Sequence, residues 1–385
     1  RVVRKNTNNE STLPLTTSAQ YGLVDQITYF NNRVASRDVS NYYLVLNGEF
    51  AYNKSTSDGY PFSAVKRLDL YEKGVLSTLY IVFAPRKERQ IDSNFLTVFF
   101  DTDRWHKGVA ERAAEGARNH GLLNISAGDF FDIDISVPKD VAEQKRIGAF
   151  IRQLDTLITL HQRKYDKLQN FKKAMLEKMF PKNGSNVPEI RFKGFTDAWE
   201  QRKLGELAEI VGGGTPSTSV ESYWDGDIDW YAPAEIGEQI YLKSSQRKIT
   251  EEGLNKSSAK VLPVGTVLFT SRAGIGKTAI LLKEGCTNQG FQSIVPNKNK
   301  LDSYFIFTRS EELKRYGETV GAGSTFVEVS GKQMANMELM MPTTMDEQQK
   351  IGEYFSNLDN LITLHQRELE KLQNIKKAML EKMFV

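Results

Sequence analysis

A 38-residue stretch with apolar residues at helical spacing occurs twice in the chain. The two copies, residues 143–180 and 347–384, match at 26 of 38 positions when they are aligned without gaps at an offset of 204. Neither copy contains proline, so each predicts a long helix, about 55 Å at about 1.5 Å per residue. Positions that recur every seven residues form a predicted seam. The seam residues are Ile147, Leu154, His161, Leu168 and Met175 in the first copy and Ile351, Leu358, His365, Leu372 and Met379 in the second.

The predicted seam needs a partner surface. In the first copy Phe150, Leu157 and Phe171 add a second apolar row, while Lys, Arg, Gln and Asp occupy the outside. The simplest way to bury both stripes is to pack the two helices against each other, and we expect an antiparallel coiled coil with pseudo-two-fold symmetry. Two independent amphipathic helices on separate cores are the alternative.

The two histidines of the seam lie near the midpoints of the helices, where an antiparallel pair would bring them together. In such a seam, His161 and His365 are expected to be packed, hydrogen-bonded residues that fix the register. A metal site or a pH switch is the alternative for this pair.

The sequence before each helix predicts a mixed module of short strands and helices. Residues 42–52, 76–84 and 130–138 have the aromatic and β-branched content of strands, and 105–121 predicts a helix ended by glycine. The linker is rich in Pro, Gly and Asn. The predicted domains are a first module at 1–140, a helix at 141–180, a linker at 181–197, a second module at 198–346 and a second helix at 347–385.

Landmarks in the two modules align although their sequences are only weakly similar. Gly48 corresponds to Gly265, and Ser126 and Pro138 correspond to Ser330 and Pro342 at the same offset of 204. A repeat period of about one domain indicates a duplicated unit, a globular module followed by a long helix. The predicted fold class is therefore α+β, with two mixed α/β modules joined by two paired helices.

Composition excludes several classes of protein. The chain has 385 residues, 40% hydrophobic and 26% charged, with a net charge of +3. No apolar run approaches the roughly 20 residues of a membrane span, so no membrane association is expected. The single cysteine, Cys286, excludes a disulfide framework and fits a reducing cytoplasm. One cysteine and four histidines leave little for a metal site.

Three motifs invite catalytic or nucleotide-binding interpretations that the residues do not support. The run GIGKT (274–278) has serine where a phosphate loop needs its first glycine, and the glycine-rich runs 211–217 and 320–325 do not match a dinucleotide fingerprint. Turns are the expected structures. The acids of PKDVAEQK (138–145) are expected at a helix start, where carboxylates are favourable, rather than in a nuclease site. No Asn/Asp-Pro-Pro-aromatic motif of an amino-methyltransferase is present.

The chain resembles the specificity (S) subunits of Type I restriction-modification systems over its whole length. The resemblance is carried by the duplicated helix and by AWEQRKLGELAEIVGGGTPS, KVLPVGTVLFTSRAGIGK, TNQGF and GSTFVEVS of the second module. The first module lacks a counterpart of AWEQRKLGELAEI, so its N-terminal edge is expected to be missing.

The resemblance implies a non-catalytic subunit in which each module is a target recognition domain for one half of a bipartite DNA sequence. The helices would fix the spacing and dock two methyltransferase (M) subunits, with restriction (R) subunits in the larger complex. S-adenosylmethionine, ATP and Mg²⁺ are expected on those partners, and no cofactor or metal on this chain. A coiled-coil scaffold that binds only protein, or a self-contained enzyme, are the alternatives.

Polar and basic residues on loops at strand ends are the candidate DNA contacts. Arg272 suits a guanine edge, and Asn53 or Gln289 an adenine edge, while ordinary surface or turn placement is the alternative for each. The candidates are Tyr52, Asn53, Lys54, Ser55, Lys66, Arg67, Ser77 and Thr78 in the first module and Thr215, Ser217, Ser271, Arg272, Lys277, Asn288, Gln289, Ser324 and Thr325 in the second.

Overall fold

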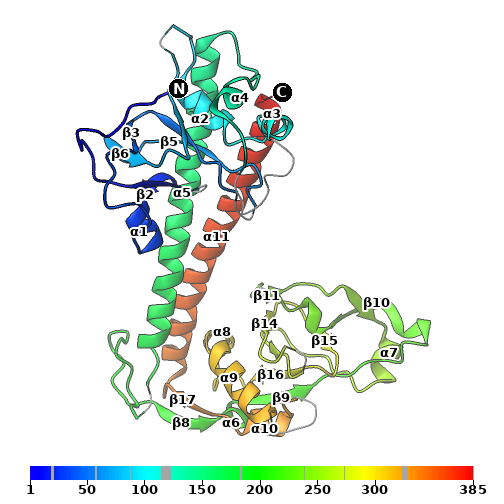
Figure 1. The fold of residues 1–385 in the computed structure, drawn as a ribbon. Helices are drawn as coiled ribbons and strands as arrows, with labels where there is room; N and C mark the ends of the chain where they lie inside the picture. The colour runs from blue at the N-terminus through cyan, green and yellow to red at the C-terminus, as the bar shows by residue number, and fades with distance from the viewer. Residues whose placement is uncertain are drawn as a thin grey trace. The chain divides into compact units, whose positions relative to one another are not determined.

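The computed structural model divides into two compact units, and each takes one half of each long helix (Figure 1). Unit 1 comprises residues 1–162 and 367–385, and unit 2 comprises residues 163–366. The structure describes residues 1–384 except 19–20, 57–58, 87, 114–122, 183, 238, 273 and 323–327.

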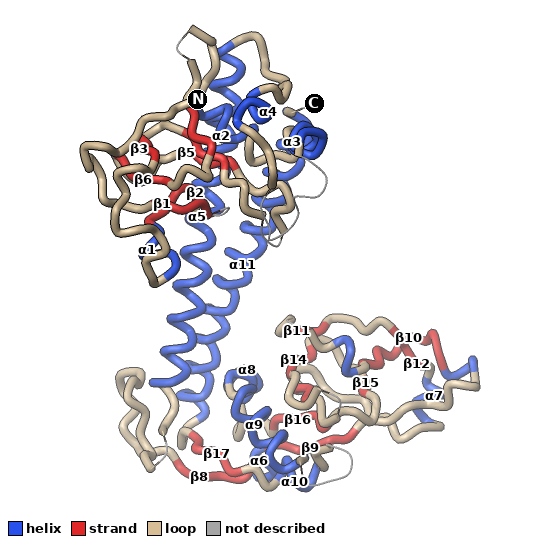
Figure 2. Tube along the Cα trace, viewed as in Figure 1, coloured by secondary structure: helices blue, strands red, loops and turns tan. Residues whose placement is uncertain are grey.

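Among the described residues of unit 1, the small sheets have the strand orders β1-β2, β3-β6 and β5-β4-β7, and Figure 2 draws strands in red. Its strands are β1 (Leu15–Ser18), β2 (Gly22–Asp25), β3 (Tyr43–Leu46), β4 (Phe50–Tyr52), β5 (Val65–Arg67), β6 (Lys73–Leu76) and β7 (Ile81–Phe83). Its helices are α1 (Gln26–Phe30), α2 (Ser93–Phe99), α3 (His106–Arg112), α4 (Ala127–Phe131) and the first part of α5 (Val141–Lys178), joined by the end of α11 (Met345–Met383).

The central strand β4 divides the core of unit 1 into two sides. Phe50 and Tyr52 point into a cluster that includes residues of α2, α5 and α11, while Ala51 points into a second cluster with Leu15 and Val82. This alternation is the period of two that a strand imposes on its side chains.

Unit 2 is built around a five-stranded sheet with the order β11-β14-β13-β16-β9, beside sheets β12-β10-β15 and β17-β8. Its strands are β8 (Glu200–Lys203), β9 (Ala208–Gly212), β10 (Trp224–Tyr231), β11 (Tyr241–Leu242), β12 (Arg247–Ile249), β13 (Val267–Phe269), β14 (Thr278–Leu281), β15 (Cys286–Thr287), β16 (Gln292–Pro296) and β17 (Glu338–Met341). Its helices are α6 (Leu204–Leu207), η1 (Glu221–Tyr223), η2 (Pro233–Glu235), α7 (Glu251–Asn255), α8 (Ser303–Thr308), α9 (Ser310–Gly321) and α10 (Gly331–Ala335), with the remaining parts of α5 and α11.

Strand β13 plays the same part in unit 2 that β4 plays in unit 1. Val267 and Phe269 point into the cluster that includes α8 and α11, and Leu268 points to the other side. The aligned glycines before these strands both have left-handed backbone, with φ of 84° at Gly48 and 86° at Gly265. Such a φ favours glycine, which explains why this landmark persists in both modules.

The long helices have the predicted position and a narrower apolar stripe than predicted. All ten seam residues are buried or half-buried. The second row is wrong as a buried row, because Phe150, Leu157 and Phe171 are 37%, 44% and 44% exposed. Ile151, on the other flank of the seam, is fully buried, so the apolar stripe extends to one side of the seam only and this second row faces solvent.

Equivalent ion pairs join α5 to α11 within each unit. In unit 1 the Lys376 ammonium lies 2.6 Å from the Asp155 carboxylate, and in unit 2 the Lys172 ammonium lies 2.5 Å from Asp359. These four residues are repeat counterparts at the offset of 204. The unit 2 pair is the more buried, and Asp359 also accepts a hydrogen bond of 2.8 Å from the Tyr304 hydroxyl.

A buried glutamine ties each long helix to its own module. The Gln144 side chain accepts a hydrogen bond from the Asp92 N–H (2.8 Å), and Gln348 accepts one from the Asp302 N–H (3.1 Å). Both aspartates cap the helix that follows them, α2 or α8. The same contact therefore recurs in both units at residues that the repeat aligns.

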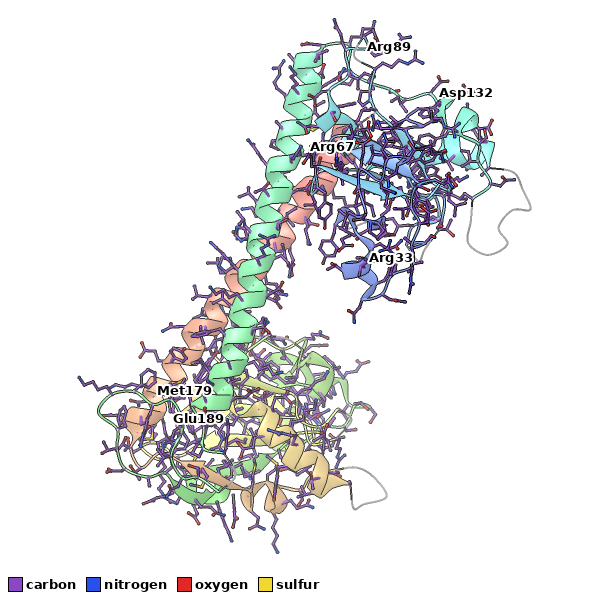
Figure 3. All side chains as sticks on the ribbon, turned by 60° about the vertical axis from the view of Figure 1, so that its left-hand side comes forward. Arg33, Arg67, Arg89, Asp132, Met179 and Glu189 are labelled. Carbon is purple, nitrogen blue, oxygen red and sulfur yellow. The ribbon has the colours of Figure 1, made fainter. Side chains whose placement is uncertain are left out.

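The end of the opposite helix completes each core. Phe384, after α11, packs 5.3 Å from the Phe95 ring in unit 1, and Phe180, after α5, packs 5.7 Å from Phe305 in unit 2 (centroid distances). Met179, labelled in Figure 3, is buried beside Phe180. Each module is thus held by its own helix and by the other one.

The predicted strand at 130–138 is wrong. Ser126 and Asp129 form a capping box, so Phe130 and Phe131 end α4, and 133–138 has no strand partner. Its repeat counterpart β17 pairs with β8, whose sequence has no counterpart in the first module. Ile133 and Ile135 still pack on the core, which explains the apolar alternation.

Part of the helix predicted at 105–121 is confirmed as α3, and residues 114–122 lie outside the described residues. Among the described residues, no helix is long and apolar enough to cross a membrane.

Candidate nucleic-acid interface

Three loops of unit 2 meet at one end of the five-stranded sheet. They follow β9, join β13 to β14, and precede β16, and they are brought together because Gly212 pairs with Gln292 and Thr270 with Phe291. The Thr215 hydroxyl donates a hydrogen bond to the Gln289 side chain across two of these loops. Five predicted contacts gather here with polar atoms at or near the surface, namely Thr215, Ser217, Lys277, Asn288 and Gln289.

The glycines of the loop after β9 allow this close packing. A Cβ atom at Gly213 would lie 2.0 Å from the Asn288 carbonyl oxygen, and one at Gly214 would lie 2.3 Å from the Ser258 hydroxyl. Two indole N–H groups hold the same loop, from Trp230 to the Gly214 carbonyl (2.8 Å) and from Trp224 to the Ser217 carbonyl (3.1 Å). The run VGGGTPS therefore comprises the last two residues of β9 and a loop at 213–217 that is held in place, where the sequence predicted a turn.

The GIGKT run forms a tight turn and not a phosphate loop. Gly274 and Gly276 have φ of 83° and 94°, and the run leads directly into strand β14. A phosphate loop leads into a helix, whose N-terminus binds the anion. The turn leaves Lys277 exposed at the sheet end.

Arg272 lies at the same sheet end but is already paired. Its guanidinium Nε lies 2.8 Å from the Glu328 carboxylate, with both side chains partly exposed. Ser271 beside it is fully buried, so the prediction of a DNA contact for Ser271 is wrong: both faces of the chain are covered throughout residues 267–271. Ser324 and Thr325 lie outside the described residues.

Unit 1 presents a smaller set of candidates at the equivalent sheet end. Asn53, Lys54 and Ser55 follow β4, and Ser77 and Thr78 precede β7, whose first residue pairs with the last residue of β4. The Asn53 side chain accepts a hydrogen bond from the Ser55 N–H at 3.0 Å, which fixes this turn. Ser55 and Thr78 are exposed, and the other three are half-buried.

One predicted contact of unit 1 is wrong, and two others stay predictions although their side chains already have partners. Tyr52 is fully buried and stacks on Phe130 with ring centroids 4.7 Å apart, and burial raises its pKa. Lys66 and Arg67 lie on β5 away from the turn. Lys66 pairs with Asp101 at 2.7 Å, and the guanidinium of Arg67 is held by Asp69, Ser93 and Asn94, so both stay predictions.

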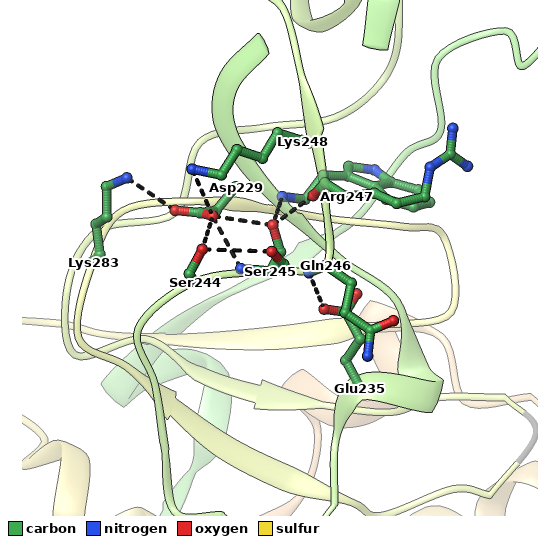
Figure 4. Close-up of polar contacts among 9 residues, drawn as sticks. Asp229, Glu235, Ser244, Ser245, Gln246, Arg247, Lys248 and Lys283 are labelled. Atoms are coloured by element: carbon green, nitrogen blue, oxygen red, sulfur yellow. Dashed lines mark hydrogen bonds and ion pairs between the residues drawn. The ribbon is translucent and has the colours of Figure 1, made fainter. Parts of the chain in front are cut away.

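The sequence-based prediction missed a polar network beside the unit 2 loops (Figure 4). Its centre is the buried Asp229 carboxylate, which pairs with Lys283 at 3.0 Å and accepts hydrogen bonds from Ser244 and Ser245. Burial alone would raise the pKa of Asp229, but the Ser245 N–H and the Lys283 ammonium together lower it to about 2. The signal in the sequence was an aspartate directly before the Trp-Tyr pair that ends an acidic, aromatic strand, followed by the basic run KSSQRK.

The described residues offer no arrangement for a resident metal. No group of three or more His, Cys, Asp or Glu side chains there is placed to hold an ion. Cys286 is buried, and burial raises its pKa to about 11, which keeps the thiol protonated and unreactive. His161 and His365 are half-buried, and their predicted role in the register stays a prediction.

The family described as "Type I restriction modification DNA specificity domain" matches residues 35–170 and 196–374. The chain belongs to this family. It is 35% identical over 190 residues to the Type I restriction enzyme MjaIX specificity subunit of Methanocaldococcus jannaschii, which covers 49% of this chain and 44% of that protein. It is 23% identical to the putative MjaX specificity subunit of the same organism over 90% of this chain and 80% of that protein. The EcoR124I/EcoR124II specificity subunit of Escherichia coli is 29% identical over 42% of this chain and 41% of that protein.

Two solved structures share the fold of this specificity subunit. The S subunit of a Type I restriction-modification system from M. genitalium aligns with a TM-score of 0.62 and 14% identity over 92% of this chain and 87% of that one. A chain from a study of complex assembly and conformational transition of the type I R-M system aligns with a TM-score of 0.50 and 17% identity. The alignment covers 99% of this chain and 93% of that one.

Proposed function

We propose that each module of this specificity subunit reads one half of a bipartite DNA target through the loops at its sheet end. The proposal rests on one observation: this end of the sheet is built in the same way in both modules. A left-handed glycine, a central strand and a polar turn occur in the same order at Gly48–Ser55 and at Gly265–Arg272. Side chains on loops vary without disturbing the sheet, which suits base recognition by divergent modules.

The two long helices form an antiparallel coiled coil with pseudo-two-fold symmetry that sets the spacing between half-sites. The ion pairs support this arrangement, because Asp155 meets Lys376 and Lys172 meets Asp359. As the residue number rises along α5, that of its α11 partner falls by the same amount. Half-sites that are reached from one face of DNA and lie one helical turn apart are separated by about 34 Å. A rod of paired helices can span such a distance.

The same helices dock two M subunits, and R subunits join the larger cytoplasmic complex. Leu157 and Leu160 of unit 1 are 44% and 47% exposed, and their repeat counterparts Leu361 and Leu364 of unit 2 are 45% and 53% exposed. Identical exposed leucines in both copies fit two equal binding surfaces. This chain acts without catalysis, while S-adenosylmethionine, ATP and Mg²⁺ bind to the partners.

Binding of DNA duplexes by the complex with M subunits tests the proposal. A library of duplexes should yield one bipartite sequence, and affinity should fall steeply as salt rises, because phosphate contacts release counterions. The alternative is a coiled-coil scaffold whose modules bind only protein. Recovery of no preferred sequence by an intact complex would favour that alternative.

A further inference from the structure

We propose that Arg247 is a specificity-determining residue of the second module and pairs with a guanine edge in its half-site. The inference rests on the proposed function and adds a residue that does not belong to the predicted loops. Arg247 begins β12, and its guanidinium carbon lies 3.6 Å from the centre of the Trp224 ring. That distance corresponds to a guanidinium laid flat on the indole.

The ring beneath Arg247 is part of the loop cluster. The Trp224 indole N–H donates to the carbonyl of Ser217, so the stacked guanidinium lies beside the exposed loop that carries Ser217. Trp224 also packs edge-to-face on Trp230, which holds the Gly214 carbonyl of the same loop. Arg247 is therefore attached to the candidate interface through a rigid aromatic platform.

The guanidinium of Arg247 is available to a ligand. Its side chain is exposed, and no carboxylate within the described residues lies at ion-pairing distance from it. Arg272, by contrast, must first leave Glu328. An arginine stacked on an aromatic face keeps its planar fork of donors in a fixed orientation, and that fork matches the two acceptors of a guanine in the major groove.

The hydrogen bonds and ion pairs around Asp229 fix the backbone at Arg247 (Figure 4). The Ser245 hydroxyl lies 2.5 Å from the Arg247 carbonyl oxygen and 3.1 Å from Asp229, and it accepts the Trp230 N–H at 2.9 Å. Lys248, on the other side of Arg247, lies 3.6 Å from Asp229. Asp229 is thus a positioning residue, and Lys248 and Lys283 add positive charge around it for nearby phosphates.

Mapping of methylated DNA by the complex with M subunits tests the inference. Arg247→Ala should lose the preference for guanine at one position of one half-site, with affinity for the original site reduced about tenfold or more. Arg247→Lys keeps the charge but loses the planar fork, so it should not restore the preference. Arg202→Ala removes a half-buried arginine of β8 that pairs with Glu206 outside the loop cluster, and should behave as the wild type.

Three outcomes would overturn the inference. They are an unchanged half-site in Arg247→Ala, full recovery in Arg247→Lys, and equal changes in both half-sites. The first excludes a role in recognition, the second reduces Arg247 to a phosphate contact, and the third excludes its assignment to one module. Failure of the wild-type complex to methylate any bipartite site would instead reject the proposed function itself.

Discussion

Asp229 shows at the residue scale how a buried charge stabilises the second module. Its pKa falls from the usual 3.8 to about 2 in the folded protein, so it stabilises the fold above pH 4 and this contribution is lost between about pH 4 and 2. The difference corresponds to about 2 kcal/mol. We expect Asp229→Asn to lower the free energy of unfolding of the second module by about that amount at pH 7.

Urea unfolding of the wild type and Asp229→Asn at several pH values checks this prediction. The gap between the two proteins should shrink as the pH falls from 4 toward 2. A gap that stays constant over this range would show that the Asp229 carboxylate does not carry the stabilisation.

Arg272 and Glu328 form a pair whose two members should affect DNA binding in opposite directions. Arg272→Ala should weaken binding about tenfold and alter one half-site only, because it removes a donor at the sheet end of one module. Glu328→Gln should strengthen binding several-fold, because it frees Arg272 and removes a negative charge near the phosphates. Titration of labelled duplexes with the complex measures both, and a change of the same sign in both variants would contradict the assignment.

Residue type and loop position predicted the sheet-end cluster, but they did not predict which side chains face outward. Tyr52 and Ser271 stand next to candidates that solvent reaches yet are fully buried, because both faces of β4, and of β13 with the two residues after it, are covered. Arg67 is a residue type that often contacts DNA, but its guanidinium is held by Asp69 two residues away and by Ser93 and Asn94 of α2. Trp224 and Arg247 meet only through the pairing of β10 with β12, which the sequence does not reveal.

At the scale of elements, the two helix ion pairs offer a matched comparison. Asp359 is 8% exposed and binds both Lys172 and Tyr304, whereas its counterpart Asp155 is 42% exposed and binds Lys376. Asp359→Ala should cost about 2–3 kcal/mol, because it leaves buried partners unpaired. Asp155→Ala should cost less than about 1 kcal/mol, as expected for a surface pair. Chemical unfolding measures both, and equal costs would contradict this explanation.

The helices were predictable because a seven-residue spacing repeats over 38 residues and is present twice. The strand predicted at 130–138 is wrong, because the alternation there comes from packing on the core, and a strand would also need a partner segment such as β8 provides for β17. The contacts of Gln144 and Gln348 were not predictable either, since a polar residue in a helix gives no indication of burial. Elements with local periodicity can be predicted, whereas those that depend on distant partners cannot.

In the whole molecule, the duplicated helices and the duplicated modules have different roles. The helices kept the residues that join them to each other and to the modules, such as Lys172 and Lys376 or Gln144 and Gln348. The modules kept a shared core strand and left-handed glycine while their loops diverged. This division is expected if the recognised DNA sequence varies while the spacing between the half-sites and the assembly with partner subunits stay constant.

The proposed ruler can be tested by lengthening both helices at their equivalent midpoints. Four residues inserted after Arg163 and four after Arg367 should preserve both ion pairs and separate the modules by about 6 Å, or about two base pairs. An insertion after Arg163 alone leaves the two helices unequal in length, and it should destabilise the complex and reduce methylation.

Genome-wide mapping of methylated adenines in cells that carry the M subunits with either the wild type or the double insertion measures the result directly. We expect the same two half-sites, separated by a spacer about two base pairs longer in the double insertion. An unchanged spacer with full methylation, or altered half-sites, would contradict this expectation.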